Sequence, residues 1–313
     1  MAYFLLLVGV VLLIVGGNVL VSSAVVLARK WHISSLLIGL LFVGFGTSLP
    51  ELATSLIAVA RGVEGIAIGN VVGSNIANIL LVLGVSAIIH PIKIPAHAFA
   101  RDAIFLGVST LVLLIAVLKG TIGTEMGALM CLTLVFYVYH AYQTDKKRQK
   151  EMSITPPLDI SNKFILPLGL WIVLFVCGLV LTLWGAHILV NNAVLVAGSF
   201  GVSETVIGLT IIAFGTSLPE LTTSIVASLK GESDIAVGNV VGSNIYNALF
   251  ILGFTALWMP VLAPYSTRGD VVVMTFATLL LLGLGWFKGS ISRRMGIVFV
   301  ILYCAYIMWL GTY

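Results

Sequence analysis

Long apolar runs, separated by short polar connections, occupy nearly the whole chain. Most reach the roughly 20 residues that a helix needs to cross the hydrocarbon core of a bilayer. The runs lack the period of two residues that the strands of a membrane β-barrel would show. The pattern therefore predicts an all-α integral membrane protein with ten transmembrane helices, at roughly 2–28, 34–60, 65–89, 102–118, 122–143, 164–190, 203–229, 235–258, 270–287 and 291–311.

Composition excludes a soluble protein. Of the 313 residues, 60% are hydrophobic and 9% are charged, and the mean hydropathy is +1.15. A soluble domain carries about 25% charged residues. The first run is too long for a cleaved signal peptide and has no cationic start, so we expect it to remain as a span. The bilayer is thus the main surroundings of the chain, and neither a nucleic-acid partner nor an obligate protein partner is indicated.

The distribution of Lys and Arg predicts the orientation. When the connections are assigned alternately to two sides, 13 of the 16 basic residues fall on the side of the first connection. The other three are Arg61, Lys119 and Arg268. Because cytoplasmic connections are enriched in Lys and Arg, the first side is predicted to be cytoplasmic and both termini extracytoplasmic. The net charge of +4 reflects this asymmetry.

The chain repeats itself at an offset of 169 residues. Residues 38–84 match residues 207–253 at 29 of 47 positions without a gap. This predicts two five-helix repeats, 1–143 and 164–313, joined by a charged cytoplasmic linker at 144–163. Because five is odd, the second repeat should enter the membrane with the opposite orientation, as in the inverted-topology repeats of many secondary transporters.

One motif interrupts an apolar run in each repeat, as GFGTSLPE at 44–51 and AFGTSLPE at 213–220. The proline in each copy has no N–H for the carbonyl four residues earlier, so each span is predicted to break there. Free backbone at membrane depth needs protein or a polar cavity to satisfy it. The two breaks offer neutral oxygens from Gly46, Thr47, Ser48, Gly215, Thr216 and Ser217.

A second motif follows in the next span, as GNVVGSNIAN at 69–78 and GNVVGSNIYN at 238–247. Its polar residues repeat every four positions and so share one helical face. Glycines beside them form a small-residue stripe, which lets transmembrane helices approach closely. We therefore expect the two polar stripes to meet the two broken helices near the midplane. The stripes are Asn70, Ser74 and Asn78, and Asn239, Ser243 and Asn247.

Two acids lie deep in the predicted spans, Glu51 and Glu220, and no Lys or Arg shares their depth. Such acids are costly unless they are protonated or neutralised by a cation from solution. Two carboxylates among hydroxyl, amide and carbonyl oxygens suit a hard cation, and Ca²⁺ accepts about 6–8 oxygen ligands in a flexible shell. The scattered cysteines and histidines predict neither a disulfide framework nor a resident metal. No cofactor is expected, and the absence of a Ser/His/Asp set or a Walker loop from the sequence argues against an enzyme.

With both motifs present in both repeats, the chain resembles the calcium/cation antiporter superfamily, and most closely the prokaryotic sodium/calcium exchangers. The resemblance implies two inverted five-helix halves with ion sites between them, and exchange of Na⁺ for Ca²⁺ by alternating access. It implies that Glu51 and Glu220 bind Ca²⁺ with the carbonyls of Thr47 and Thr216. It assigns the sodium sites to Ser48, Ser74, Ser217 and Ser243 with the carbonyls of Gly44 and Ala213, and the central site is completed by Asn78 and Asn247.

One departure concerns the coupling ion. Some relatives, including the potassium-dependent exchangers, carry Asp at the position of Asn247, whereas both repeats here have Asn. This argues against potassium coupling. The alternatives are a H⁺/Ca²⁺ antiporter, in which the two acids take protons, and a K⁺-dependent Na⁺/Ca²⁺ exchanger. A cation channel is less favoured, because inverted internal repeats suit alternating access better than a symmetric pore.

Overall fold

The protein is an all-helical membrane protein with four very short strands. The computed structural model describes residues 2–94, 96–152, 166–200 and 213–310. Within these residues, seven helices are long and apolar enough to cross a membrane, or eight if one bent pair counts as a span. The elements in the first half are α1 (Ala2–Trp31), α2 (Ser35–Ile38), the π-helix η1 (Gly39–Val43), α3 (Gly44–Thr47), α4 (Leu49–Ala60), α5 (Glu64–Ile76), η2 (Ala77–Val82), α6 (Leu83–Ile89), β1 (Ile92–Lys93), α7 (Ala96–Lys119), β2 (Thr121–Ile122) and α8 (Thr124–Met152).

The second half repeats this order of elements. They are α9 (Leu168–Ser199), α11 (Ala213–Thr216), α12 (Leu218–Leu229), α13 (Ser233–Tyr246), η4 (Asn247–Ile251), α14 (Leu252–Trp258), β3 (Val261–Leu262), α15 (Thr267–Phe287), β4 (Ser290–Ile291) and α16 (Arg293–Leu310). The start of the predicted run 203–229 lies outside the described residues.

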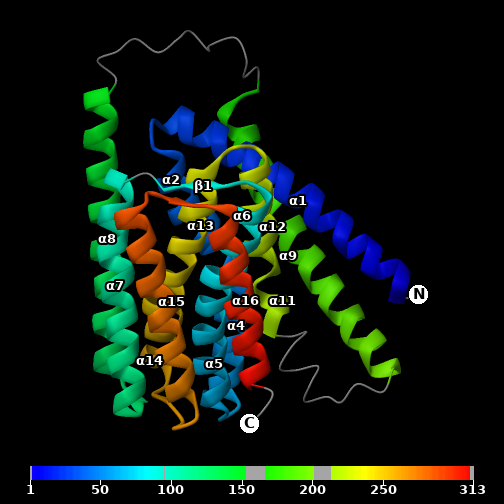
Figure 1. Ribbon diagram of the computed structural model, residues 1–313, viewed down its shortest axis with the longest axis vertical. Coiled ribbons are helices and arrows are strands. Elements are labelled where there is room, and N and C mark those ends of the chain that lie inside the picture. The colour runs from blue at the N-terminus through cyan, green and yellow to red at the C-terminus, as the bar shows by residue number, and fades with distance from the viewer. Residues whose placement is uncertain (1, 95, 153–165, 201–212, 311–313) are drawn as a thin grey trace.

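Two spans that contain no break form the interior. In the spans α5–η2–α6 and α13–η4–α14, 72% and 83% of the most apolar stretch is buried, against 33% in α1 and 28% in α9. Figure 1 shows α1 and α9 lying together and crossing the bundle obliquely at one side. The two interior spans are therefore the buried centre, and α1 and α9 form a peripheral pair.

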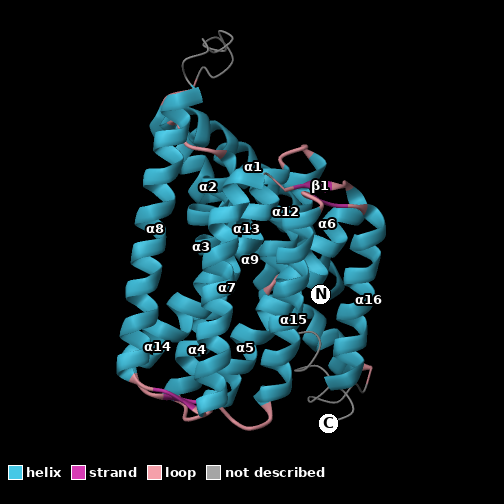
Figure 2. Ribbon diagram, turned by 60° about the vertical axis from the view of Figure 1, so that its left-hand side comes forward, coloured by secondary structure: helices cyan, strands magenta, loops and turns pink. Residues whose placement is uncertain are grey.

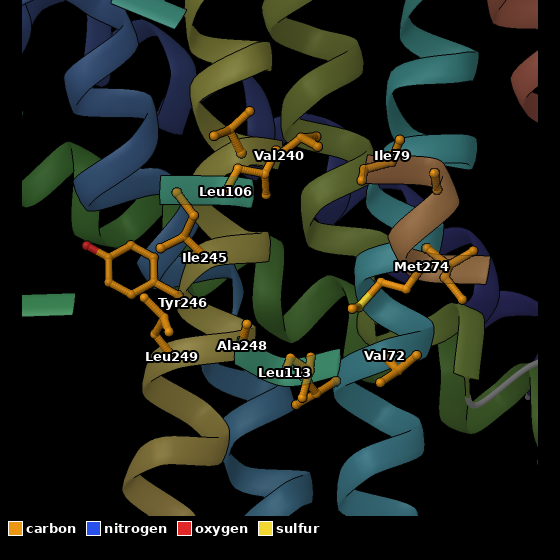
Figure 3. Close-up of a cluster of buried hydrophobic side chains, with 14 of the residues drawn as sticks. Val72, Ile79, Leu106, Leu113, Val240, Ile245, Tyr246, Ala248, Leu249 and Met274 are labelled. Atoms are coloured by element: carbon orange, nitrogen blue, oxygen red, sulfur yellow. The ribbon is translucent and has the colours of Figure 1, made fainter. Parts of the chain in front are cut away.

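Apolar side chains from several spans pack between the interior helices (Figure 3). Val72 and Ile79 come from the first interior span, Val240 and Ile245 from the second, and Met274 comes from α15. All five are buried, with exposed fractions of 0%. Polar groups in this region are therefore shielded from lipid and water by a closely packed shell.

The peripheral pair depends on glycines. An added Cβ at Gly16 would lie 2.6 Å from the backbone nitrogen of Thr182, and one at Gly178 would lie 2.5 Å from that of Leu20. Real side chains do not tolerate such distances, so only glycine permits this approach. This is the close helix contact that small residues allow inside membranes. The predicted small-residue stripe behaves similarly in the second half, where a Cβ at Gly242 would lie 2.5 Å from the carbonyl oxygen of Leu40. In the first half the prediction is wrong, because a Cβ at Gly69 or Gly73 would meet nothing within 4 Å.

The strands connect the two halves at opposite ends of the molecule (Figure 2). β1 pairs antiparallel with β4, with Ile92 opposite Ile291. β2 pairs antiparallel with β3, with Ile122 opposite Val261. Each half thus contributes one strand to each end.

Both predicted breaks are present. Ser48 ends α3 with φ −82° and ψ 4°, and the helix axis bends by 40° before α4 continues. Ser217 has nearly the same conformation, φ −88° and ψ 5°, between α11 and α12. In both cases the proline occupies the first turn of the following helix, where its missing N–H costs nothing. The sequence-based prediction of two broken spans is confirmed at these points.

Two features differ from the pattern read from the sequence. The interior spans are not continuous α-helices, because π turns η2 and η4 begin at Ala77 and Asn247. In addition, α8 continues to Met152, so residues 144–152 of the predicted linker are helical. This stretch contains no Pro or Gly, and its charged side chains are compatible with a solvated helix. The rest of the predicted linker, 153–163, lies outside the described residues.

Candidate functional site

The two deep glutamates lie near the start of the helices that follow the breaks. Glu51 lies in the first turn of α4 and Glu220 in the first turn of α12, and both are 0% exposed. The positive ends of these helix dipoles favour the carboxylates. The ion pair within the described residues, Arg101 with Asp102, involves neither of them. Their charge therefore has no basic partner in the described part of the chain.

Hydroxyl groups contact one oxygen of each carboxylate and leave the other free. Ser74 Oγ donates to Glu51 Oε1 at 3.4 Å. Ser48 Oγ at 3.4 Å and Ser243 Oγ at 3.5 Å contact Glu220 Oε1. The Oε2 atoms of both glutamates are buried and find no hydrogen-bond partner among the described residues. The long distances and the free oxygens are what a site prepared for a cation would show.

Contacts from one half to the other bring the two motifs together. Ser48 precedes Glu51 by three residues and bonds to Glu220, so the two carboxylates face a common region. Ser243 Oγ donates to the carbonyl of Gly44 at 3.1 Å. Thr47 Oγ1 donates to Asn239 Oδ1 at 3.2 Å. The site is therefore built jointly by the two halves.

Asn70 and Asn239 fix the backbone beside the acids. Asn70 Nδ2 donates to the carbonyl of Glu51 at 3.0 Å and to Ser55 Oγ at 3.1 Å. Asn239 Nδ2 donates to the carbonyl of Glu220 at 3.2 Å and to Ser224 Oγ at 2.9 Å. These two members of the predicted polar stripes support the glutamate backbone, whereas Ser74 and Ser243 contact the carboxylates.

Four asparagines join the interior spans at the crossing of α5 and α13. Asn78 Nδ2 donates to Asn244 Oδ1, and Asn247 Nδ2 donates to Asn75 Oδ1, each at 3.0 Å. Asn75 and Asn244 were not singled out by sequence reasoning. Their signal in the sequence was the GSN triplet repeated in both halves. The Oδ1 atoms of Asn78 and Asn247 are buried without a partner among the described residues.

The remaining predicted residues also lie at the two breaks. The Oγ atom of Ser217 is buried and has no hydrogen-bond partner among the described residues. Thr216 is the last residue of α11 and is partly exposed. Gly44 begins α3, and its carbonyl accepts from Ser48 N at 3.2 Å as well as from Ser243. Ala213 begins α11 at the edge of the described residues.

Five buried oxygens in this region thus lack a hydrogen-bond donor among the described residues. They belong to two carboxylates, two amides and one hydroxyl: Glu51, Glu220, Asn78, Asn247 and Ser217. An unsatisfied buried polar group costs about 1–3 kcal/mol, and more if it is charged. A group of oxygen acceptors without donors suits a hard cation, which satisfies many oxygens at once.

Comparison with known proteins agrees with this chemistry. The family model described as sodium/calcium exchanger protein matches residues 1–143 and 170–312. The chain belongs to the sodium/calcium exchanger family. It is 38% identical over 316 residues to the putative antiporter CaxA of Alkalimonas amylolytica, covering 98% of this chain and 96% of that protein. It is 34% identical to the inner membrane protein YrbG of Escherichia coli K12, covering 99% and 96%.

A solved member of the family has the same architecture. The sodium-calcium exchanger NCX_Mj, soaked with zero Na⁺ and Ca²⁺, superposes with a TM-score of 0.84 at 30% identity and covers 98% of both chains. The resemblance drawn from the two motifs is therefore confirmed. As a member of this family, the chain is an integral membrane antiporter of cations, including Ca²⁺, and not an enzyme.

Proposed function

We propose that this family member is a secondary active antiporter that exchanges Na⁺ for Ca²⁺ by alternating access and extrudes Ca²⁺ electrogenically. The observation that carries the proposal is the group of five buried oxygens that have no donor in the described part of the chain. They include oxygens of two glutamates that have no basic partner there. The proposed ion-binding residues are Glu51, Glu220, Thr47, Thr216, Ser48, Ser217, Ser74, Ser243, Asn78, Asn247, Gly44 and Ala213.

Charge balance favours Ca²⁺ as one cargo. Glu51 and Glu220 together carry two negative charges when ionised, which neutralise one Ca²⁺ in a region that water does not reach. Ca²⁺ tolerates an irregular shell of carboxylate, amide and carbonyl oxygens, whereas Mg²⁺ requires a rigid octahedron and keeps its water. Na⁺ would use overlapping oxygens, so that binding of one cargo displaces the other.

The two halves are proposed to be inverted five-helix repeats, 1–143 and 164–313, joined by residues 144–163. Seven long apolar helices, the bent pair, α8 and the α11–α12 segment together would give ten spans. Strands at equivalent positions pair crosswise at opposite ends, and Asn75 and Asn244 donate to each other's carbonyls at 3.2 Å. Reciprocal contacts of this kind support a pseudo-two-fold relation between the halves.

Equivalent positions in the two halves have different contacts, which supports alternating access. Lys230 Nζ contacts Ser22 Oγ at 2.5 Å and the Asn18 carbonyl at 3.2 Å, both on α1. The residue equivalent to Lys230 is Arg61, which is exposed, and the residues equivalent to Asn18 and Ser22 are His187 and Asn191 of α9. These last two bond to each other at 3.0 Å. One end of the peripheral pair is thus held to the end of α12, while the equivalent contact at the other end is absent among the described residues. This asymmetry is compatible with two states in which the contacts at the two ends alternate.

The exchange should respond to membrane voltage. Roughly three Na⁺ for one Ca²⁺, which the family resemblance implies, would move one net charge in each cycle. Such a charge is worth about 2.3 kcal/mol per 100 mV. With an inward Na⁺ gradient and a negative interior, both terms favour Ca²⁺ extrusion.

Flux in sealed vesicles tests the proposed function directly. Purified protein in proteoliposomes loaded with Na⁺ is expected to accumulate radiolabelled Ca²⁺ against its gradient, and equimolar choline inside should abolish the uptake. A channel would equilibrate Ca²⁺ without a counter-ion gradient, and an enzyme would move none. Either of those results would contradict antiport.

The orientation of the chain in the membrane is a separate expectation. Single cysteines placed near Gln149 and near each terminus, in a background in which Cys131, Cys177 and Cys304 are replaced, should react differently with a membrane-impermeant maleimide. In intact cells only the terminal cysteines should be labelled, because the 13-to-3 bias in Lys and Arg places the linker inside. Labelling of the linker rather than the termini would reverse the proposed topology.

A further inference from the structure

Asn75 and Asn244 lie outside the proposed set of ion-binding residues, yet both are almost completely buried beside it. Their exposed fractions are 2% and 1%. Each Nδ2 donates to the backbone carbonyl of the other residue at 3.2 Å, so the pair joins α5 to α13 in both directions. Each Oδ1 accepts from an asparagine of the opposite half, Asn247 in one case and Asn78 in the other.

These contacts determine which way the Asn75 amide points. Its Nδ2 group also approaches Met274 Sδ at 3.7 Å. In the reversed orientation, its oxygen would face both the Asn244 carbonyl and this sulfur, which are acceptors. Only one orientation is therefore compatible with the surroundings, and in that orientation Asn75 presents an acceptor to Asn247.

The orientation of Asn247 follows from that of Asn75. A primary amide carries its acceptor and its donors on opposite sides of one carbon. Since Asn247 Nδ2 is held by Asn75 at 3.0 Å, Asn247 Oδ1 points away from Asn75 and remains unpartnered. Asn244 acts in the same way on Asn78. A released amide could turn its NH₂ group toward a bound cation, which would repel it.

We propose that Asn75 and Asn244 are positioning residues that fix the cation-binding oxygens of Asn247 and Asn78, each acting on the opposite half. The inference rests on the proposed function, since it takes those two oxygens as cation ligands. Each holder donates to the backbone carbonyl of the other, so it stays anchored when only the other side chain is replaced. The pair lets two neutral side chains serve as oriented ligands without another charge in the site.

A crossed set of double mutants tests this assignment. Asn75→Leu keeps the size of the side chain and removes the acceptor, and it is expected to weaken equilibrium binding of radiolabelled Ca²⁺, in Na⁺-free buffer, by about tenfold. In an Asn247→Ala background, Asn75→Leu should change Ca²⁺ affinity by less than about twofold, because no amide is left to orient. In an Asn78→Ala background its effect should stay near tenfold. Asn244→Leu should show the mirror pattern, losing its effect with Asn78→Ala and keeping it with Asn247→Ala.

Thermal unfolding of the same variants separates two roles of the asparagine pair. One role is to orient the ion-binding amides, and the other is to join α5 to α13. Loss of the bond to the Asn244 carbonyl should lower the melting temperature by a similar amount in every background. Equal losses of Ca²⁺ affinity in all backgrounds, or no loss, would overturn the proposal while leaving antiport intact. Wild-type protein that binds no Ca²⁺ would overturn both. If the Leu variants do not fold, Asn75→Asp still offers an acceptor to Asn247, provided that its other oxygen carries a proton and donates to the Asn244 carbonyl. In that form it should bind Ca²⁺ within about threefold of wild type. A tenfold weakening in that variant would also contradict the assignment.

Discussion

Glu51→Gln and Glu220→Gln are each expected to abolish Ca²⁺ exchange in protein that still folds. Each substitution removes one of the two carboxylate charges of the proposed site and changes the shape of the side chain very little. Removing one partner of a buried charged pair costs about 3–5 kcal/mol, so Ca²⁺ affinity should fall by about 100-fold or more. Radiolabelled Ca²⁺ uptake into Na⁺-loaded proteoliposomes measures the effect.

A matched control is available in Glu125, which is exposed in the first turn of α8. Glu125→Gln should exchange Ca²⁺ at the wild-type rate. The wild type should also show a Ca²⁺-dependent rise in melting temperature, because a ligand that binds only the folded state stabilises it. The two site variants should lose that rise. Normal uptake by either variant would remove its glutamate from the proposed site.

Proline and carboxylate at membrane depth made the two breaks and the two acids predictable. Each is costly inside an apolar run, so its presence carries information about function. Pro50 and Pro219 marked the bends, and Glu51 and Glu220 marked the side chains that the structure buries beside them. The repeat at a fixed offset made it reasonable to expect that both copies contribute to one region, and the bond from Ser48 to Glu220 agrees with this.

The asparagine pairing could not be read from the sequence. A spacing of four residues places Asn70, Ser74 and Asn78 on one face of an ideal α-helix, but Asn78 lies within the π turn η2. Such a turn rotates the residues that follow it. Which amide faces which also depends on how α5 and α13 are rotated against each other, and that is decided by packing across the whole interface. Asn75 was therefore overlooked although it lies beside Ser74.

The helical extension of α8 escaped prediction for a different reason. Residues 144–152 are mostly charged, and the end of the apolar run at residue 143 predicts a connection there. A helix can continue into water where nothing interrupts it. Asp145 gives this part of the helix a tertiary contact, since its Oδ2 accepts from the backbone nitrogen of Ser34 at 2.8 Å. Contacts so distant in sequence are not encoded in local pattern.

The coupling ion is expected to be Na⁺, and the reason lies in Asn78 and Asn247. Each amide offers one oxygen and no titratable charge, so Glu51 and Glu220 are the ionisable groups of the proposed site. The two carboxylates neutralise the charge of one Ca²⁺, or of two Na⁺ ions when several Na⁺ are bound. A third acid would be the natural place for an extra K⁺ or a shuttled proton, and the sequence has Asn at both equivalent positions. An outward Na⁺ gradient should therefore drive Ca²⁺ uptake into vesicles without K⁺, and uptake should survive a proton ionophore once the membrane potential is clamped.

Asn247→Asp is expected to change this ion dependence more than it changes folding. Asn247 Nδ2 donates to Asn75 Oδ1 at 3.0 Å, so an aspartate would place an oxygen against an oxygen unless it takes a proton or Asn75 turns its amide. The variant thus has a third acid in the site, and this acid is neutral when it holds a proton and charged when it holds a cation. Its Ca²⁺ exchange should therefore become sensitive to pH or to K⁺ at a fixed Na⁺ concentration. Asn78→Asp provides the matched comparison from the other half, since it faces Asn244 Oδ1 at the same distance. If wild-type exchange required K⁺, or ran on a pH gradient with no Na⁺ present, the assignment of Na⁺ as the coupling ion would be wrong. The mechanism would then be K⁺-dependent exchange or H⁺/Ca²⁺ antiport, and the two carboxylates would have to serve K⁺ or a proton as well, without a third acid in the site.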